Sequence, residues 1–310
     1  MPKLSIISVN KSTQKGTIKL PADQIKLTQY GVAGDAHAGP WNRQVSLLGT
    51  ESIRKFEADA RRKVNHGEFA ENITTTGMEI WASHPLDRFT SGDIELEVTQ
   101  IGKECHGTSC AIYKEVGNCV MPKEGIFCRV LSPGILTAGM ELEYHPKVFR
   151  IMVITLSDRA SSGEYEDRSG PRVTELLESH FTSLGFLHSI SGFLIPDDRQ
   201  KLEELLHKAK EELVDFVFTT GGTGIGPRDF TPDVVGRLLD KEIPGIMEMI
   251  RMKYGTEKPA ALVSRSVAGV MGKSLVFTLP GSVRAVNEYM AEISKSMTHL
   301  VYMLHGLDSH

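Results

Sequence analysis

The sequence predicts a two-part protein: a mostly-β barrel over residues 1–146, followed by an α/β domain over residues 147–310 with a mainly parallel sheet. Two observations support this prediction. The first half consists of short strand-like segments separated by glycine turns, which is typical of a closed or nearly closed barrel. The second half alternates continuous apolar strands with amphipathic helices, which is typical of a parallel sheet covered on both faces. The break between the two patterns falls near residues 141–149.

Length and composition agree with two soluble domains. The chain has 310 residues, of which 40% are hydrophobic and 24% are charged. Its net charge of −4 argues against a broad nucleic-acid-binding surface. No apolar run is long enough to span a bilayer, and the N-terminus lacks the apolar core of a signal peptide. We therefore expect a cytoplasmic protein with no nucleic acid or membrane partner and with reduced cysteines.

In the first half, residues 94–102 alternate apolar and polar side chains, which predicts a half-buried strand. Residues 50–64 show the one clear helical pattern, with Thr50 placed to cap the helix. Further strands are predicted at 43–49 and 125–131, and turns at 35–42 and 131–140.

In the second half, residues 149–156 form a continuous apolar strand, and residues 169–185 have the apolar spacing of a helix. Ser169 is placed to cap this helix and Gly185 to end it. The remaining strands are predicted at 186–195, 215–220 and 274–279, and the remaining helices at 197–213, from Pro232, and after 280–290.

The stretch TTGGTGIGPRDFTPD, residues 219–233, follows a buried strand and leads into a helix. In an open α/β sheet, ligands bind at the carboxyl ends of the strands. Glycines let the backbone approach a ligand and present N–H groups that suit phosphate oxygens. Thr231 is predicted to cap the following helix, and Asp233 to lie at its positive end. A purely structural turn is the alternative, because the motif is neither a Walker loop nor a dinucleotide-binding loop.

Acidic residues accompany this loop. Asp229 lies inside it, and a carboxylate beside a phosphate site is repelled unless a cation such as Mg²⁺ separates the two. Asp197 follows the end of another strand. Asp198 and Asp233 are more simply explained as helix caps. Other strand ends supply Ser157, Asp158, Arg159 and Asp167, among which Arg159 could pair with Asp167, and the segment Pro280, Gly281 and Ser282.

Residues 149–306 resemble the molybdopterin adenylyltransferase (MogA/MoaB-like) family, which also forms the first domain of gephyrin. The matching segments are SDRASSGEYEDRSGP, IPDD, TTGGTGIGPRDFTPD, EIPGIMEMIR, ALVSRSVAGV and LVFTLPGS. The resemblance implies a three-layer α/β/α fold, a homotrimer through this domain, and Mg²⁺-dependent transfer of the adenylyl group of ATP to molybdopterin. The family's two essential acids fall on Asp197 and Asp229, as catalytic residues and metal ligands. We assign substrate and cofactor binding to Ser157, Asp158, Arg159, Thr220, Gly221, Gly222, Thr223, Gly224, Pro280, Gly281 and Ser282.

All four cysteines lie in the first half, at 105, 110, 119 and 128. Cys105 follows the strand 94–102 and has Lys103 and His106 beside it, and nearby positive charge favours a reactive thiolate. An unreactive core cysteine is the alternative. A zinc site is a further alternative, although the spacing lacks the paired C-x2-C of a zinc ribbon. Cys128, within a predicted strand, is expected to be a buried inert thiol.

Residues 4–143 resemble a MOSC domain, the β-barrel domain related to the C-terminal part of molybdenum cofactor sulfurases. The matching segments include GVAGDAHAG, RQVSLL, FAENITTTG, GKECH and MPKEGIFCRVLSPGILTAGM. The resemblance implies a cysteine that carries sulfur as a persulfide or contacts the cofactor, and Cys105 fits best, with Cys119 second. Asp35, His37 and Arg43 could line the same pocket, although Asp35 and His37 also have a purely structural explanation.

Together the two halves predict a bifunctional molybdenum cofactor assembly protein. A molybdenum-insertion protein or molybdoenzymes would then be its partners. Three alternatives stay open at this point: a non-catalytic molybdopterin carrier, a nucleotide hydrolase or pyrophosphatase similar to the competence-damage protein family, and a redox-sensing or metal-binding protein centred on the cysteines.

Overall fold

The computed structural model describes residues 2–104 and 119–307, and the chain divides into two compact units, Met1–Lys147 and Val148–His310. Each unit has a hydrophobic core of its own. The domain limits predicted from the sequence, 1–146 and 147–310, differ from this division by one residue and stay a prediction. Within the described part of the chain, no helix combines the length and the apolar character that a membrane crossing requires.

The first unit is a closed β-barrel, as predicted. Seven strands form the ring in the order β11-β7-β8-β9-β5-β6-β1, and β1 pairs back onto β11. β2 extends the ring beside β1, and β10, β3 and β4 form a separate sheet. The elements are β1 (Lys3–Lys11), β2 (Leu20–Ala22), β3 (Gln24–Thr28), β4 (Gly31–Val32), β5 (Val45–Gly49), α1 (Thr50–Ala60), β6 (Ile73–Thr76), η1 (Ile80–Ala82), β7 (Arg88–Ser91), β8 (Ile94–Ile101), α3 (Met121–Glu124), β9 (Ile126–Ser132), β10 (Gly134–Thr137) and β11 (Glu141–His145).

The barrel core follows from the alternation of each strand. In β8, Ile94, Leu96 and Val98 belong to the buried core, as the period-2 pattern predicts. Glu97 points to the other face, where its carboxylate lies 2.6 Å from the guanidinium of Arg129 on β9. The pairing of β8 with β9 thus combines an apolar inner face with an ion-paired outer face.

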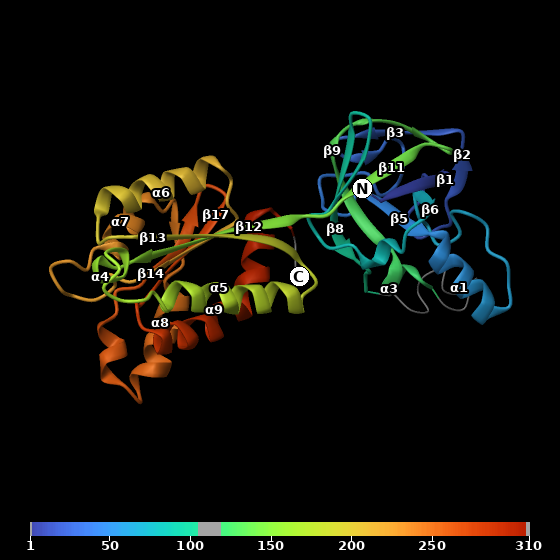
Figure 1. Ribbon diagram of the computed structural model, residues 1–310. Coiled ribbons are helices and arrows are strands. Elements are labelled where there is room, and N and C mark those ends of the chain that lie inside the picture. Colours follow the sequence, from blue (N-terminus) through green and yellow to red (C-terminus); the bar gives the residue numbers. More distant parts are fainter. Residues whose placement is uncertain (1, 105–118, 308–310) are drawn as a thin grey trace. The chain divides into compact units, whose positions relative to one another are not determined.

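The second unit is an α/β/α domain, as predicted. Its sheet has the order β13-β12-β14-β17-β16-β15, in which the first four strands are parallel and the last two are antiparallel. α6 and α7 cover one face, and α5, α8 and α9 cover the other (Figure 1). The elements are β12 (Val148–Leu156), α4 (Asp158–Ser161), α5 (Ser169–Ser183), β13 (Leu187–Ile195), α6 (Arg199–Glu211), β14 (Phe216–Thr220), α7 (Thr231–Leu238), β15 (Lys241–Glu242), α8 (Pro244–Gly255), η3 (Pro259–Val263), β16 (Ala268–Met271), β17 (Ser274–Leu279) and α9 (Val283–Leu304).

Four predicted helix caps are wrong. Asp233 lies inside the first turn of α7, where its carboxylate pairs with Arg265. Thr50, Ser169 and Thr231 are each the first residue of a helix rather than the residue before it. At α5, the carboxylate of Asp167 accepts the N–H of Ser169 at 2.9 Å, because it lies two residues earlier and reaches the free donor. At α7, Thr231 donates its own N–H to the carbonyl of Gly222 at 3.1 Å, which ties the helix to the glycine loop. Sequence patterns locate a helix end only to within a residue or two.

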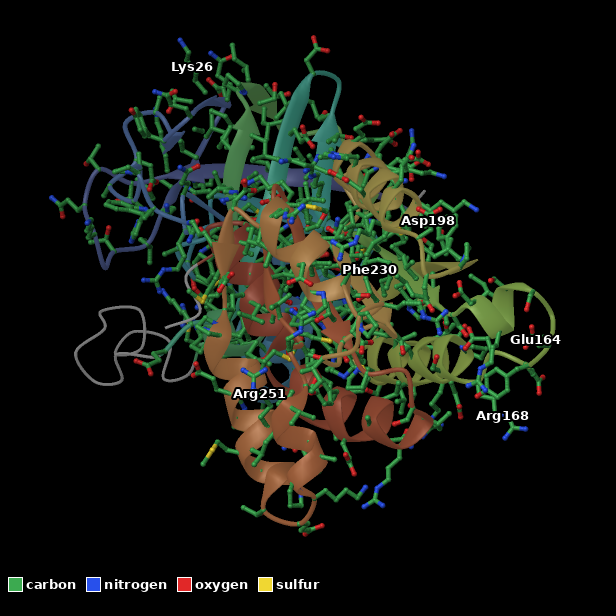
Figure 2. All side chains as sticks on the ribbon, turned by 90° about the vertical axis from the view of Figure 1, so that its left-hand side faces the viewer. Lys26, Glu164, Arg168, Asp198, Phe230 and Arg251 are labelled. Carbon is green, nitrogen blue, oxygen red and sulfur yellow. The ribbon has the colours of Figure 1, made fainter. Side chains whose placement is uncertain are left out.

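Other local predictions are confirmed. Asp198, which is labelled in Figure 2, caps α6 by accepting N–H groups of its first turn. Gly185 follows the end of α5 in the left-handed region, with φ of +72°. The strand predicted at 274–279 coincides with β17. The turn prediction for 131–140 is incomplete, because β10 forms there by pairing with β3.

Candidate active site

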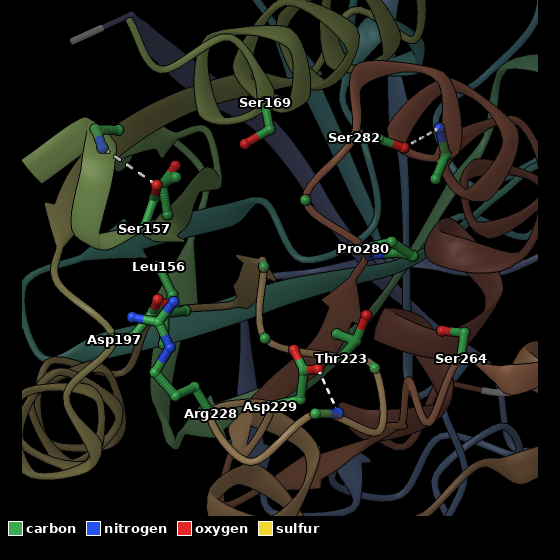
Figure 3. Close-up of a pocket in the computed structure, with 18 of the residues that line it drawn as sticks. Leu156, Ser157, Ser169, Asp197, Thr223, Arg228, Asp229, Ser264, Pro280 and Ser282 are labelled. Carbon is green, nitrogen blue, oxygen red and sulfur yellow. Dashed lines mark hydrogen bonds between the residues drawn. The ribbon is translucent and has the colours of Figure 1, made fainter. Parts of the chain in front are cut away.

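A cavity of about 870 Å³ lies at the carboxyl ends of the parallel strands in the second unit. The segments that follow β12, β13, β14 and β17 form part of its lining, so the four predicted strand ends meet at one place (Figure 3). Asp197 and Asp229 both line it. Thr220 does not line it, but its hydroxyl donates to the carbonyl of Pro280 at 3.0 Å. The other predicted residues that line the cavity are Ser157, Asp158, Arg159, Gly221, Gly222, Thr223, Gly224, Pro280, Gly281 and Ser282.

The glycine loop after β14 has a backbone that needs glycine. Gly221 and Gly222 have φ of +105° and +62°. A Cβ on Gly221 would lie 2.4 Å from the carbonyl oxygen of Leu156, so the loop passes directly over β12. The N–H of Gly221 donates to Leu279 at 3.0 Å and is therefore not available to a ligand. Within the described chain, the N–H groups of Gly222, Thr223 and Gly224 have no acceptor, which leaves them for phosphate.

Arg265 holds the carbonyl side of this loop. Its backbone N–H donates to Thr223 at 2.9 Å, and its side chain donates to the carbonyls of Gly224 at 2.9 Å and Asp229 at 2.6 Å. The same guanidinium forms a two-pronged ion pair with Asp233 of α7, with both N–O distances at 2.9 Å. One side chain therefore fixes the loop at both ends and joins it to the helix that follows.

The position of Asp229 is set within the loop. Its Oδ2 accepts the N–H of Gly226 at 2.8 Å. A Cβ on Gly224 or Gly226 would lie 2.7 or 2.9 Å from the same oxygen. These two glycines are therefore required for the carboxylate to fold back against its own loop while it lines the cavity.

Asp197 lies in an acidic environment. Its backbone N–H donates to Oδ1 of Asp158 at 2.9 Å, and Oδ2 of Asp158 lies 2.6 Å from Nη1 of Arg228. Partial burial raises the pKa of Asp197 above its ordinary value of 3.8, and the negative charges of Asp158 and Asp229 raise it further. The two predicted acids are therefore close enough to influence each other, and a cation between them would favour their ionised forms.

Several lining residues also stabilise the site. The hydroxyl of Ser157 accepts the N–H of Ala160 at 3.2 Å and caps α4, and that of Ser282 accepts the N–H of Ala285 at 3.3 Å and caps α9. The guanidinium of Arg159 lies 5.6 Å from the ring centroid of Tyr165. The suggested pairing of Arg159 with Asp167 is wrong, because the Asp167 carboxylate caps α5 instead.

The sequence did not single out three further charged residues that line the cavity. Glu288 of α9 lies there, 3.4 Å from the ammonium of Lys258 and 3.0 Å from the guanidinium of Arg284. Lys258 and Arg284 come from the chain before η3 and from the first turn of α9, where no glycine cluster marks a site. Arg228 was visible in the loop motif, next to Asp229, and its position could have indicated a role.

The carboxylates of Asp158, Asp197 and Asp229, which we call the acidic wall, fit a magnesium ion. Mg²⁺ prefers oxygen ligands and is usually held by one or two carboxylates together with waters and substrate phosphates. Asp197 and Asp229 supply such carboxylates beside the free N–H groups of the glycine loop. Within residues 2–104 and 119–307, no group of three or more His, Cys, Asp and Glu side chains is arranged to hold a metal, so a cage made of protein alone is absent there.

In the first unit, Asp35 is the centre of a buried polar network. Lys19 donates to both of its oxygens at 2.7 Å, and both side chains are 1% exposed. Asn72 and the backbone N–H groups of Ser12 and His37 donate to the same carboxylate. Burial tends to raise the pKa of Asp35, but the bonds from His37 and Lys19 outweigh it and hold this pKa well below its usual range. This arrangement favours the structural explanation of Asp35.

The other candidate site residues of the first unit differ in how exposed they are. The ring of His37 is partly exposed, and Arg43 is exposed. Cys119 is partly buried. Cys105, like His106 and Cys110, lies outside the described residues. Cys128 is fully buried and burial raises the pKa of its thiol, which confirms the prediction of an inert cysteine.

Comparison with known proteins gives matches for both units. Residues 152–299 match the family model described as "probable molybdopterin binding domain", and residues 34–143 match the MOSC domain model. The chain is 35% identical over 162 residues to a molybdopterin adenylyltransferase of Helicobacter pylori, which covers 52% of this chain and 90% of the relative. It is 35% identical over 159 residues to that of Escherichia coli K12 (51% and 79%). It is 36% identical over 165 residues to molybdenum cofactor biosynthesis protein B of Bacillus cereus (52% and 93%).

Proposed function

The chain belongs to the molybdopterin adenylyltransferase family, and because its residues 152–299 match the molybdopterin binding domain model and its residues 34–143 the MOSC domain model, we propose that it acts in molybdenum cofactor assembly. Its second unit is a nucleotidyltransferase that converts molybdopterin and ATP into adenylylated molybdopterin and pyrophosphate. The observation that most supports this proposal is the meeting of Asp197 and Asp229 in one cavity beside a glycine loop with free N–H groups.

The cavity suits a reaction between two anions. The terminal phosphate of molybdopterin must approach the α-phosphorus of ATP, so repulsion and misalignment dominate the barrier. The N–H groups of Gly222, Thr223 and Gly224 would hold phosphate oxygens. Arg265 already fixes the carbonyl side of this loop, so the donors need little reorganisation when the substrate binds. No general base is needed, because a phosphate nucleophile is ionised at neutral pH.

Asp197 and Asp229 are the residues that would hold Mg²⁺. The ion would supply neutralising charge to the α-phosphate and to the departing pyrophosphate. The protein's part is to keep both carboxylates at the cavity: Asp229 is held by its bond to Gly226, and Asp197 by its backbone bond to Asp158.

A non-catalytic carrier of molybdopterin is the second candidate. It would need the binding donors of the loop but not a pair of mutually repelling acids, and this pair favours the enzyme. For the first unit we propose that it handles the same cofactor, with Cys105 or Cys119 carrying sulfur or contacting the pterin. The proposal also includes a homotrimer through the second unit, a cytoplasmic location, and a molybdenum-insertion protein or molybdoenzyme as acceptor.

The test is incubation of the full chain with ATP, Mg²⁺ and molybdopterin, followed by chromatography for adenylylated pterin and an assay for pyrophosphate. Asp197→Asn and Asp229→Asn should each reduce turnover by about a hundredfold or more. Asp198→Asn is the matched control, because it changes the neighbouring acid but keeps a good cap on α6. Normal turnover in Asp229→Asn would refute the assignment, and pterin binding without product in the wild type would indicate a carrier.

A further inference from the structure

Arg228 is an exposed cation in contact with the acidic wall of the cavity. It lies in the glycine loop, directly before Asp229, and its Nη1 is 2.6 Å from Oδ2 of Asp158. Its side chain is 75% exposed. Figure 3 shows its guanidinium beside Asp197. One contact therefore brings a positive charge from the loop to the wall that contains three of the cavity's carboxylates.

The other two arginines near this wall have different partners. The guanidinium of Arg159 lies over the ring of Tyr165, and that of Arg265 forms a two-pronged pair with Asp233 and holds the loop. Among the residues that the structure describes, Arg228 is thus the arginine that forms an ion pair with the acidic wall. Asp158, its partner, uses its other oxygen to hold the backbone of Asp197.

The Arg228 contact is suited to exchange. An exposed ion pair is weak, so a divalent ion at the acids can replace it. A guanidinium also binds phosphate oxygens in a two-pronged manner. The loop backbone is held by Arg265 and by the bond from Gly226 to Asp229, so Arg228 can change partner by side-chain rotation alone.

On the basis of the proposed function, we propose that Arg228 is a built-in counter-cation: it neutralises the acidic wall until the divalent ion and nucleotide bind, and then moves from Asp158 to a phosphate group. Before the nucleotide binds, Arg228 compensates the negative charge of the acids. After the nucleotide binds, Arg228 is a phosphate ligand. The two roles have opposite consequences when the side chain is removed, which makes them separable by experiment.

The first measurement is the affinity of the full chain for Mn²⁺ in the absence of nucleotide. It is detected through the electron paramagnetic resonance signal of the free Mn²⁺. Arg228→Met removes a positive charge that competes with the metal, so we expect about threefold to tenfold tighter binding. Arg284→Met is the matched control: it removes an exposed arginine that lines the same cavity but pairs with Glu288, and Mn²⁺ binding should change by less than about twofold. Arg228→Gln serves as a second variant that keeps a hydrogen-bonding side chain.

The second measurement is ATP binding at saturating Mg²⁺ by calorimetry. Here Arg228→Met should bind ATP about threefold to tenfold more weakly, and Arg228→Lys should recover part of this loss, because it keeps the charge without the two-pronged fork. Weaker or unchanged Mn²⁺ binding in Arg228→Met overturns the proposal. An equal shift in Arg284→Met, or no Mn²⁺ binding by any variant, also overturns it. If the variants show these shifts but the wild type forms no adenylylated pterin, the proposed function is disproved and the role of Arg228 stays supported.

Discussion

Replacing Arg265 by lysine should disorder the glycine loop while leaving the domain folded. A lysine ammonium can keep a contact with Asp233, but it lacks the fork that also reaches the carbonyls of Gly224 and Asp229. Each lost bond contributes about 0.5–1.5 kcal/mol net. The side chain is 38% exposed, so solvent replaces part of this, and about 1–2 kcal/mol of loop stability is lost in total.

A loss of this size corresponds to a factor of about 5–30 in the population of the ordered loop. Because Asp229 and the N–H donors are held only in that state, kcat/KM for adenylylated pterin should fall by a similar factor. Unfolding of the whole domain should change less, because the loop can open locally. The assay combines steady-state kinetics with hydrogen exchange of the peptide that contains residues 221–230.

Arg251→Lys is the matched control for this experiment. Its Nη1 donates to the carbonyls of Ser264 and Ser266, at 3.3 and 3.1 Å, and so holds the chain on either side of Arg265 rather than the glycine loop. We expect normal exchange in the loop of this variant. The reasoning is refuted if Arg265→Lys keeps wild-type kcat/KM, or if both variants show the same exchange in the loop.

Three further predictions follow from buried contacts. Gly222→Ala should lower turnover by at least about tenfold, measured by product formation, because φ of +62° and a Cβ only 2.5 Å from Oγ1 of Thr231 force the loop to move. Asp35→Asn should destabilise the first unit by about 3–5 kcal/mol in denaturant titration, because it leaves Lys19 buried without a counter-charge; a loss below about 1 kcal/mol would contradict this. The native pKa of Asp35 lies below the ordinary 3.8, so its contribution to the free energy of unfolding is fully present above pH 3.8 and is lost as the pH falls further. Acid titration of the wild type should show this loss, and Asp35→Asn should lack it.

The architecture of both units was predictable because it depends on repeated patterns. The barrel follows from alternating strands such as β8, and the second sheet from apolar runs such as β17, in which every residue is buried. Many residues contribute to each of these patterns, so a single exception does not change the result. A helix cap depends on one residue, and there the sequence offers competitors: Asp167 and Ser169 are both good caps, and only the backbone shows which one is used.

The site was predictable to the extent that it lies at strand ends. Asp197 and Asp229 follow strands, and the topology of a parallel sheet brings such residues together. Glu288 and Lys258 come from helical segments, whose contribution depends on how α8, η3 and α9 pack. The role of Arg265 was hidden for a similar reason, because its partners are backbone carbonyls, and carbonyls have no signature in a sequence.

Arg265 and Arg228 differ in how many partners restrain them. This difference suits Arg265 to supporting the glycine loop and Arg228 to exchanging one partner for another. Arg265 uses its fork on Asp233 and on two carbonyls, so moving it would break several bonds at once. Arg228 has one exposed partner, Asp158, and can leave it by rotating its side chain. A site that must accept a dication and then a polyphosphate needs both properties: a rigid cradle for the phosphate and a movable charge for the acids. The Asp233 carboxylate maintains this difference, because it neutralises Arg265 and holds that guanidinium at the loop, where it does not bind the substrate.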